Sequence, residues 1–237
     1  MAEERIAERI DANLLNIDLN ELQTMTKEDY ERKFKVLQNK AHGKLIIKEF
    51  PMGKTTPNTI ENHIQKCRDL GHPPDLVIID YVDLLKSKTR SIDPKDAIDD
   101  VYTAVKGMAR EIKVPVWTVS QVNRMGAKDD VIEGDKAAGS YNKMMIADFA
   151  MSLSRKRQDK VNGTGRMHVM KNRYGADGMT YAAKVNTNCG RIEISKDEMD
   201  EDNLTFDTGK PNGHGNNGSF SADEKNYLSK KFFEMNL

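Results

Sequence analysis

The chain has 237 residues, of which 38% are hydrophobic and 31% charged, and its 37 basic and 37 acidic residues give a formal net charge of zero. This composition is typical of a soluble globular protein and excludes the whole-domain basic footprint that many DNA-binding proteins carry. No apolar stretch approaches the roughly 18 residues of a membrane helix, and Met1 to Leu15 is charged and amphipathic rather than a signal peptide. We therefore expect a cytoplasmic protein that makes no membrane contact.

Cysteine and histidine spacing gives no sign of a metal cluster. Cys67 and Cys189 lie far apart in the sequence, without the spacing of metal ligands, and the five histidines are scattered. Reduced thiols in a cytoplasm are the simplest interpretation.

Hydrophobic periodicity predicts helices that alternate with short apolar strands through the first two thirds of the chain. Residues 76–80 (LVIID) form a continuous apolar run of the kind found in parallel strands that are buried on both faces. The predicted elements are, in order, helices at 3–15 and 26–38, a strand at 45–47, a helix at 57–70, a strand at 76–80, a helix at 94–112, and strands at 114–119 and 147–153.

This alternation predicts an α/β fold with right-handed crossovers and an open, mainly parallel sheet. Catalytic and binding groups of such sheets gather at the carboxyl ends of the strands, where Asp80 and Gln121 both lie. Trp117, inside its strand, is predicted to belong to the core.

After Ser154 the pattern changes to an alternation with period two, which predicts a closing antiparallel set with strands at 167–171, 180–185 and 191–194. Beyond residue 194 follow an acidic run, a Gly- and Asn-rich stretch at 209–218, and a short amphipathic helix at 221–235. We therefore expect two regions, an α/β domain at 1–194 and a linker with a C-terminal helix at 195–237.

Three short segments supply the groups that a nucleotide-hydrolysing motor needs. Residues 76–80 end in Asp80, residues 120–124 (SQVNR) contain Gln121, and residues 171–175 (KNRYG) carry Lys171 and Arg173. Phosphoryl transfer requires an acid that holds Mg²⁺, a polar group near the γ-phosphate or attacking water, and cations for the developing charge. The segments supply one of each, in that order.

Five separated patches resemble, in the family's order, the replicative hexameric DNA helicases of the DnaB type (superfamily 4), most closely the helicase subunit of large tailed myoviruses. They are MAEERIAERIDAN at 1–13, IDY at 79–81, VSQVNR at 119–124, ADF at 147–149 and MKNRYG at 170–175. The resemblance covers roughly residues 1–194. It implies a RecA-like motor that uses ATP or another NTP with Mg²⁺, forms a homo-hexamer on single-stranded DNA and unwinds duplex DNA, in the host cytoplasm if the protein is viral.

The same resemblance assigns roles to individual residues. Asp80 would hold the metal, Gln121 would sense the γ-phosphate, Arg173 would be the arginine finger that reaches a neighbouring subunit's site, and Lys171 its companion cation. Arg155 matches a nucleotide-contacting family arginine less distinctly. The alternatives are a helix N-cap for Asp80, an ordinary polar strand end for Gln121, and solvated surface charges for the cations.

DNA contacts are expected on the loops that follow the Asp80 and Gln121 strands, where basic side chains can hold the phosphates of a single strand. The candidates are Lys86, Lys88, Arg90, Arg124, Lys128, Lys136 and Lys143. The match to the family weakens at 138–141 (AGSY), where DnaB proteins usually carry an Arg-Glu-Ser-Gly stretch. The C-terminal helix is a candidate docking element for primase or a helicase loader.

Gly53-Lys54-Thr55 imitates the end of a phosphate-binding P-loop, but the first glycine of that motif is replaced by Lys48. A lysine does not readily adopt the backbone conformation that turns the loop amides toward phosphate. In the resembled family the true P-loop and a catalytic glutamate precede the segment that matches Met1. We therefore expect an N-terminally truncated motor that is inactive alone.

Two alternatives remain open. A non-catalytic RecA-like module that binds replication partners is favoured for this chain alone by the missing P-loop. A recombinase-type ATPase shares the fold, but the Lys171-Asn172-Arg173 segment on a strand after the sensor is a feature of the helicase group.

Overall fold

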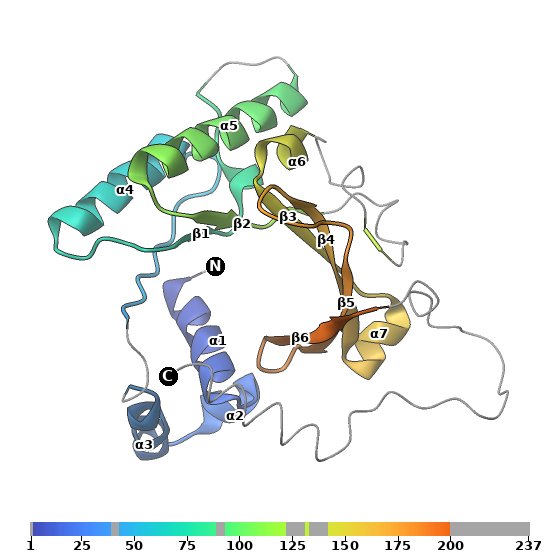
Figure 1. Cartoon of the computed structure of the whole chain (residues 1–237). Coiled ribbons are helices and arrows are strands. Elements are labelled where there is room, and N and C mark those ends of the chain that lie inside the picture. Colours follow the sequence, from blue (N-terminus) through green and yellow to red (C-terminus); the bar gives the residue numbers. More distant parts are fainter. Residues whose placement is uncertain (1, 39–42, 89–92, 122–130, 133–141, 200–237) are drawn as a thin grey trace, which may run out of the picture. The chain divides into compact units, whose positions relative to one another are not determined.

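The computed structural model describes residues 2–38, 43–88, 93–121, 131–132 and 142–199 (Figure 1). The chain divides into two units, Met1–Leu204 and Thr205–Leu237, and every described residue belongs to the first. Within the described residues, none of the helices is both long enough and apolar enough to cross a membrane.

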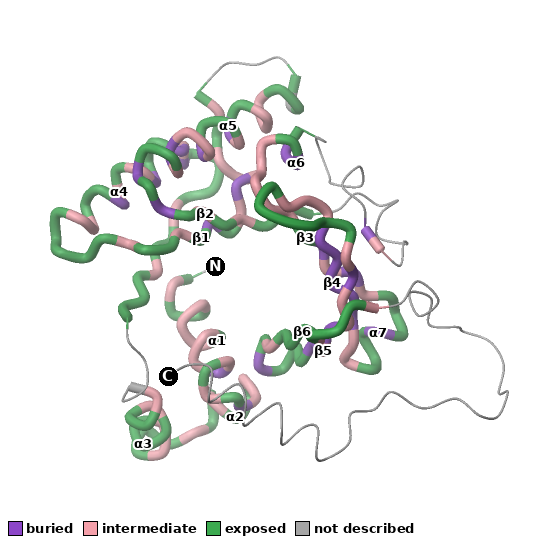
Figure 2. The backbone as a smooth tube through the Cα atoms, in the orientation of Figure 1, coloured by how far each residue is buried: buried purple, intermediate pink, exposed green. Residues whose placement is uncertain are grey.

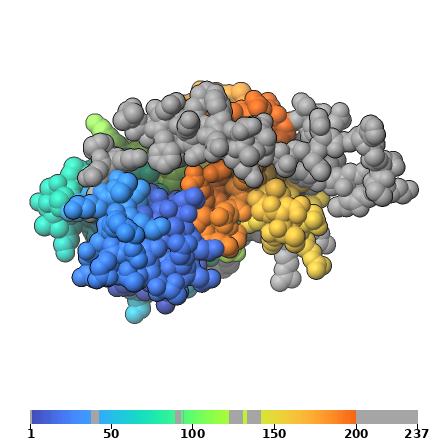
Figure 3. Space-filling view, turned by 90° about the horizontal axis from the view of Figure 1, so that it is seen from below, coloured from blue at the N-terminus to red at the C-terminus, as the bar shows by residue number. Residues whose placement is uncertain are grey.

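Three helices open the chain: α1 (Glu3–Leu15), α2 (Leu19–Thr24) and α3 (Lys27–Gln38). The Tyr30 hydroxyl of α3 donates to the Asp11 carboxylate of α1 over 3.1 Å. The segment also binds the turn after β5: Leu19 N–H donates to the Asn188 carbonyl over 3.1 Å, and Asn13 Nδ2 donates to the Gly190 carbonyl over 3.0 Å. These bonds join the N-terminal segment, coloured blue in the space-filling view of Figure 3, to residues far along the sequence.

A parallel pair of strands forms the centre of the next region. Strand β1 (Val77–Ile79) pairs in parallel with β2 (Val116–Thr118). Helix α4 (Pro57–Asp69) begins at a capping box between Thr56 and Thr59, and α5 (Pro94–Ile112) begins after Asp93, whose carboxylate accepts from Lys95 N–H over 2.8 Å. The two helices and the 3-10 helix η1 (Val82–Leu84) enclose one core cluster with the strands, made of Ile60, Ile64, Ile79, Val82, Val101, Val105, Met108, Ile112 and Val114.

The parallel pair is buried on only one face, since exposed residues alternate with buried or half-buried ones along each strand. Figure 2 colours these classes along the backbone. Ile79 is 9% exposed and packs in the core, whereas its neighbour Ile78 is 70% exposed. The prediction that Trp117 belongs to the core is wrong, because its side chain is 44% exposed on the same face as Ile78, with which it is paired in the register. Side chains alternate between the faces of a strand, and the described residues provide no layer that buries this second face.

The remaining strands form an antiparallel sheet in the order β3-β4-β5-β6. They are β3 (Phe149–Ser154), β4 (Thr164–Asn172), β5 (Thr180–Asn186) and β6 (Arg191–Glu198), and the short helices α6 (Asn142–Ile146) and α7 (Arg157–Asn162) flank β3. The strand predicted at 147–153 was assigned to the parallel set, but β3 pairs antiparallel with β4. The short β3–α7–β4 connection explains this, since a parallel neighbour needs a crossover of a dozen or more residues.

A buried ion pair closes one end of this sheet. The Arg166 guanidinium, almost fully buried, donates to the Asp159 carboxylate over 2.9 Å. Asp159 also accepts from Lys156 N–H over 2.7 Å and from the Thr164 hydroxyl over 3.1 Å. Burial favours the neutral acid, but these hydrogen bonds and the Arg166 charge outweigh it and hold the pKa of Asp159 below its ordinary value. Arg166 is therefore a structural residue.

Most predicted elements are present, and one is not. The helices predicted at 3–15 and 94–112 have the observed bounds, and β6 runs past the predicted domain boundary at residue 194. The strand predicted at 45–47 is wrong, because this described segment has no regular structure and Leu45 is exposed. A strand needs a neighbour to satisfy its backbone, and no described strand pairs there. The predicted linker and helix at 209–235 lie outside the described residues.

Candidate functional site

Asp80 and Gln121 follow neighbouring parallel strands, as predicted. Asp80 comes directly after β1 and Gln121 three residues after β2, and both are exposed. Thr118 fixes the strand ends to each other: its hydroxyl donates to the Ile79 carbonyl over 2.9 Å and accepts from Val82 N–H over 3.1 Å. The strand ends thus present a carboxylate and an amide at the same edge of the sheet.

A polar group that the sequence did not reveal lies beside this edge. The Lys143 ammonium pairs with the Asp83 carboxylate, donates to the Ser120 hydroxyl over 3.0 Å and lies 5.2 Å from the centre of the Tyr102 ring. Tyr102 in turn donates to Asp83 over 3.2 Å, and burial, helped by that carboxylate, raises the pKa of Tyr102. Lys143 is buried, so the predicted DNA contact, which stays a prediction, requires its ammonium to leave Asp83.

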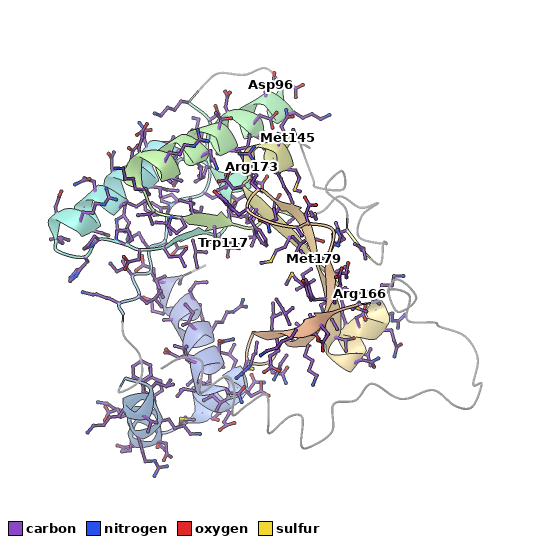
Figure 4. The ribbon with its side chains drawn as sticks, in the orientation of Figure 1. Asp96, Trp117, Met145, Arg166, Arg173 and Met179 are labelled. Carbon is purple, nitrogen blue, oxygen red and sulfur yellow. The ribbon has the colours of Figure 1, made fainter. Side chains whose placement is uncertain are left out.

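The predicted arginine finger is held by an acid. Arg173 Nη1 lies 3.0 Å from Asp148 Oδ1, its Nη2 donates to the Met145 carbonyl over 3.1 Å, and its backbone N–H donates to the Asp148 carbonyl over 2.9 Å (Figure 4). Lys106 of α5 pairs with the other oxygen of Asp148. The hydrogen bond from Lys106 is the main cause that holds the pKa of Asp148 below its ordinary value. We call Lys106, Asp148, Lys171 and Arg173 the Asp148 cluster.

Lys171 completes the Asp148 cluster from β4. Its ammonium donates to the carbonyls of Met144 and Met145 over 2.7 and 2.9 Å, at the carboxyl end of α6, where a cation is favoured by the exposed carbonyls. Partial desolvation and the nearby charge of Arg173 lower the pKa of Lys171. Two cations therefore pair with one carboxylate and a third lies nearby, which leaves an excess of positive charge beside the exposed Arg173 guanidinium.

Arg155 is not part of this group. Its Nε donates to the Thr164 carbonyl over 3.0 Å, at the opposite end of the β3–β4 ladder from Arg173. Strand β3 has six residues between these ends, so the separation is about 20 Å. The predicted nucleotide contact of Arg155 stays a prediction, and here the side chain braces the start of β4.

Gly53, Lys54 and Thr55 form a turn and a helix entry. Lys54 N–H donates to the Pro51 carbonyl over 3.4 Å, and the Thr55 hydroxyl donates to the same carbonyl over 2.8 Å. The Thr55 carbonyl accepts from Lys86 N–H over 2.8 Å. In a P-loop the corresponding hydroxyl binds Mg²⁺ and the amides face phosphate, whereas here these groups bind the chain itself.

The remaining predicted DNA contacts are only partly described. Lys86 and Lys88 are exposed after η1, on the side of the sheet where the strands end. Arg90, Arg124, Lys128 and Lys136 lie outside the described residues.

The Asp148 cluster and the polar group that Asp83 forms with Lys143, Ser120 and Tyr102 contain acids and an aromatic residue that sequence reasoning did not assign. Asp148 stood within the ADF patch used for the resemblance, so that patch was an available signal. Lys106, Asp83 and Tyr102 carried none, because only the packing of α5 against η1 and beside Asp148, the residue before β3, brings them to these positions.

The residues at the strand ends fit a nucleotide-bound magnesium ion. Mg²⁺ usually keeps several waters and takes one or two protein carboxylates together with substrate phosphates. Asp80, exposed at the end of β1, supplies one such carboxylate, and no group of three or more potential metal ligands occurs in the part of the chain that the structure describes. A metal carried mainly by phosphates suits this arrangement better than an all-protein cage.

Comparisons with known proteins identify the family of this chain. The family model described as DnaB-like helicase C terminal domain matches residues 1–189. The chain is 26% identical over 186 residues to the DnaB-like replicative helicase of Enterobacteria phage T4, and the match covers 74% of this chain and 38% of that protein.

Two solved structures share the RecA-like fold. The first, a solved ATPase domain, is 18% identical with a TM-score of 0.66, over 81% of this chain and 70% of that one. A DnaB-like replicative helicase, solved in a study of its interactions with primase, has the same identity and TM-score over 81% of this chain and 49% of that one. The chain therefore spans well under half the length of the phage T4 relative and about half the length of the second structure.

Proposed function

Because the chain belongs to the family of the DnaB-like helicase C-terminal domain, we propose that it supplies the metal, sensor and arginine-finger residues of an ATP-driven replicative DNA helicase. The observation that carries the proposal is the combination of the family match over residues 1–189 with the cation-rich Asp148 cluster around Arg173. The intact motor would move along single-stranded DNA as a homo-hexameric ring and unwind duplex DNA.

Each side chain has a defined role in this proposal. Asp80 would hold Mg²⁺, which neutralises charge on the phosphates of bound ATP or another NTP. Gln121 would hydrogen-bond the γ-phosphate or the attacking water from the end of the neighbouring strand. Arg173 would donate to the equatorial phosphate oxygens of the next subunit's nucleotide, where charge accumulates in the transition state.

The Asp148 cluster supports a finger that is oriented before it acts. Asp148 and the Met145 carbonyl fix the guanidinium from two sides, while the backbone bond to Asp148 fixes the residue itself. Arg173 has five N–H donors, so these contacts leave donors for a phosphate. Orientation of this kind lowers the cost of placing the cation when the reaction occurs.

The same proposal includes two kinds of binding partner, single-stranded DNA and a replication protein. Single-stranded DNA would contact the exposed Lys86 and Lys88 and the loops after β2, and the region after residue 195 would contact primase or a helicase loader. The second solved structure supports the choice of primase only by likeness, since its primase interaction is a property of that protein.

The chain alone should not hydrolyse ATP, because Gly53-Lys54-Thr55 offers no phosphate-binding loop. We expect the purified protein to show no ATPase above background, with or without single-stranded DNA, in a phosphate-release assay. Adding a polypeptide that carries the P-loop portion of the domain, fused or as a second chain, should restore turnover. Robust turnover by the chain alone would place the P-loop at Gly53 to Thr55 after all.

A non-catalytic interaction module is the second candidate, and the folding of residues 51–55 as a turn favours it for the chain in isolation. The same assay separates the two functions. If no P-loop polypeptide restores hydrolysis while the chain still binds primase or a loader, the module is the correct assignment.

A further inference from the structure

Helix α6 has a charged side chain near its start that other segments hold. Lys143 is buried, pairs with the Asp83 carboxylate of η1 and donates to the Ser120 hydroxyl over 3.0 Å. Ser120 directly precedes the proposed sensor Gln121. One ammonium therefore joins α6, η1 and the segment that carries the sensor. We call Asp83, Tyr102, Ser120 and Lys143 the Lys143 group.

The other end of α6 holds the proposed finger. The Met145 carbonyl accepts from Arg173 Nη2 over 3.1 Å and from the Lys171 ammonium over 2.9 Å, and Figure 4 labels both Met145 and Arg173. Ala147 N–H donates to the Lys143 carbonyl over 3.1 Å, so a helical hydrogen bond closes the turn between the two ends. The sensor segment and the finger are thus joined through a single turn of helix.

Helix α5 braces the same connection. Tyr102 donates to Asp83 over 3.2 Å, and Lys106 pairs with Asp148. Tyr102 and Lys106 lie four residues apart on α5, so they share one face of that helix. Asp148 in turn pairs with Arg173 over 3.0 Å. One face of α5 therefore contacts both the Lys143 group and the Asp148 cluster.

The ion pair between Lys143 and Asp83 is poorly explained by stability. The two side chains are 6% and 16% exposed. Taking two charges out of water has a large cost, and replacing such a pair by apolar residues of similar volume is often neutral or stabilising. What the pair contributes instead is a fixed geometry between the segments that it joins.

We propose that Lys143 is a positioning residue of the motor, which through α6 sets the place of the finger Arg173 relative to the sensor Gln121. The inference rests on the proposed function and adds to it a residue that touches neither the nucleotide nor the reacting atoms. The sensor would serve the subunit's own nucleotide and the finger the neighbour's. Lys143 therefore connects two adjacent nucleotide sites of the ring.

The connection is tested first in the chain by itself. The Nε–H group of an arginine gives its own signal in heteronuclear NMR spectra, and the Arg173 signal is identified by its loss in Arg173→Lys. Lys143→Met and Asp83→Asn each remove the ion pair and should each shift the Arg173 signal. Lys160→Met, at an exposed lysine of α7, is the matched control and should leave that signal unchanged. An Arg173 signal that neither ion-pair variant shifts would overturn the proposal.

A third variant removes both charges, because one buried charge left alone destabilises a fold. Lys143→Met combined with Asp83→Leu replaces the ion pair by apolar side chains of similar shape. This variant should keep the thermal midpoint of the wild type by circular dichroism and still shift the Arg173 signal. A wild-type signal in the folded variant would show that packing alone places the finger, and the proposal would be wrong.

The effect on the reaction is measured in a motor that also contains its P-loop portion. Lys143→Met and Asp83→Asn should each lower kcat at least about tenfold and leave nucleotide affinity within about twofold, because misplaced groups lose turnover and not ground-state binding. The double variant should lose no more than either single one, since both remove the same connection. Lys160→Met should have no effect. Additive losses, or weaker nucleotide binding at unchanged kcat, would contradict a positioning role.

A direct contact of Lys143 with DNA, the role expected from the sequence, gives a different pattern. Lys143→Met would then weaken single-stranded DNA binding and reduce its salt slope by about 1, whereas Asp83→Asn would release the ammonium and strengthen binding. Opposite effects of this kind would replace the positioning role by the DNA contact. A motor with its P-loop portion that hydrolyses no ATP contradicts the helicase proposal instead, and the Arg173 signal of the chain then decides the connection by itself.

Discussion

At the scale of single residues, two acids with depressed pKa values have different roles. Asp148 is partly exposed and gathers Lys106 and Arg173 beside the proposed finger site, so its ion pairs orient a group that must still reach a ligand. Asp159 of α7 is buried with Arg166 and contacts only the start of its own helix and strand β4, so its ion pair is structural. Basic residues flank Asp159 in the sequence but not Asp148, so only the packing reveals the ion pairs of Asp148.

Arg173 and Lys54 are the two candidate phosphate-binding cations. In a motor that also contains its P-loop portion, replacing each of them by alanine should have different effects. Arg173→Ala should lower turnover by about 10³-fold or more while nucleotide affinity is kept, because a finger acts mainly on transition-state charge. Lys54→Ala should change turnover and nucleotide affinity by less than about twofold, since Lys54 lies in a turn in which its backbone N–H donates to the Pro51 carbonyl. Steady-state ATPase and fluorescent-nucleotide binding measure both; a large effect of Lys54→Ala on affinity would refute the turn assignment.

Asp159→Asn should destabilise the fold by about 3 kcal/mol, because it leaves the Arg166 charge buried without its partner. The pKa of Asp159 is lowered in the folded state, so the stabilisation from its carboxylate is present above the unfolded pKa of about 3.9 and is lost as the pH falls through the folded value. Urea unfolding at several pH values should therefore show the difference between wild type and variant shrinking below about pH 4. Asp177→Asn, at an exposed acid, is the matched control, and a pH-independent difference would argue against this linkage.

At the scale of elements, prediction succeeded where the local signal and the packing agree. Helix α5 has a capping acid at Asp93 and a regular apolar stripe, and its predicted bounds are those observed. The apolar run at 76–80 correctly predicted a parallel strand, but sequence has no means of showing that only one face would be covered. The run at 45–47 carries the same β propensity and forms no strand among the described residues, since strand formation depends on a partner that propensity does not report.

One-sided burial of β1 predicts an asymmetry between adjacent isoleucines. Ile79→Ala removes a buried side chain from the core cluster and should cost about 2 to 5 kcal/mol, whereas Ile78→Ala, on the exposed side, should cost less than about 0.5 kcal/mol. Chemical denaturation of the two variants measures the difference directly. Equal destabilisation by both would mean that the face of β1 that carries Ile78 is covered in solution.

At the scale of the whole molecule, the family patches predicted the fold and the order of the site residues, yet not how the site is assembled. Asp80 and Gln121 meet at one sheet edge because β1 and β2 are parallel neighbours, which the strand pattern already implied. Arg173 and Arg155, grouped by sequence, are separated by the length of β3, because an antiparallel turn sends them to opposite ends of one ladder. Arg173 follows the end of β4 with an exposed guanidinium, as the proposed role in a neighbouring subunit's site requires.

Mixing experiments test that role in trans. In a completed motor, Arg173→Ala removes the finger that a subunit gives to its neighbour, and Asp80→Ala removes the metal ligand of a subunit's own site. A mixed ring contains interfaces where an intact Asp80 faces an intact Arg173, so mixtures of the two inactive variants should recover part of the ATPase rate, in proportion to the fraction of such interfaces. Subunit exchange is verified by energy transfer between labelled variants, and mixtures of wild type with either variant establish that a ring tolerates inactive sites. Mixed rings that form and tolerate inactive subunits, yet show no recovery of the ATPase rate with the two variants together, would mean that Arg173 serves its own subunit's site or none. Its contacts with Asp148 would then be structural, like those of Arg166 with Asp159.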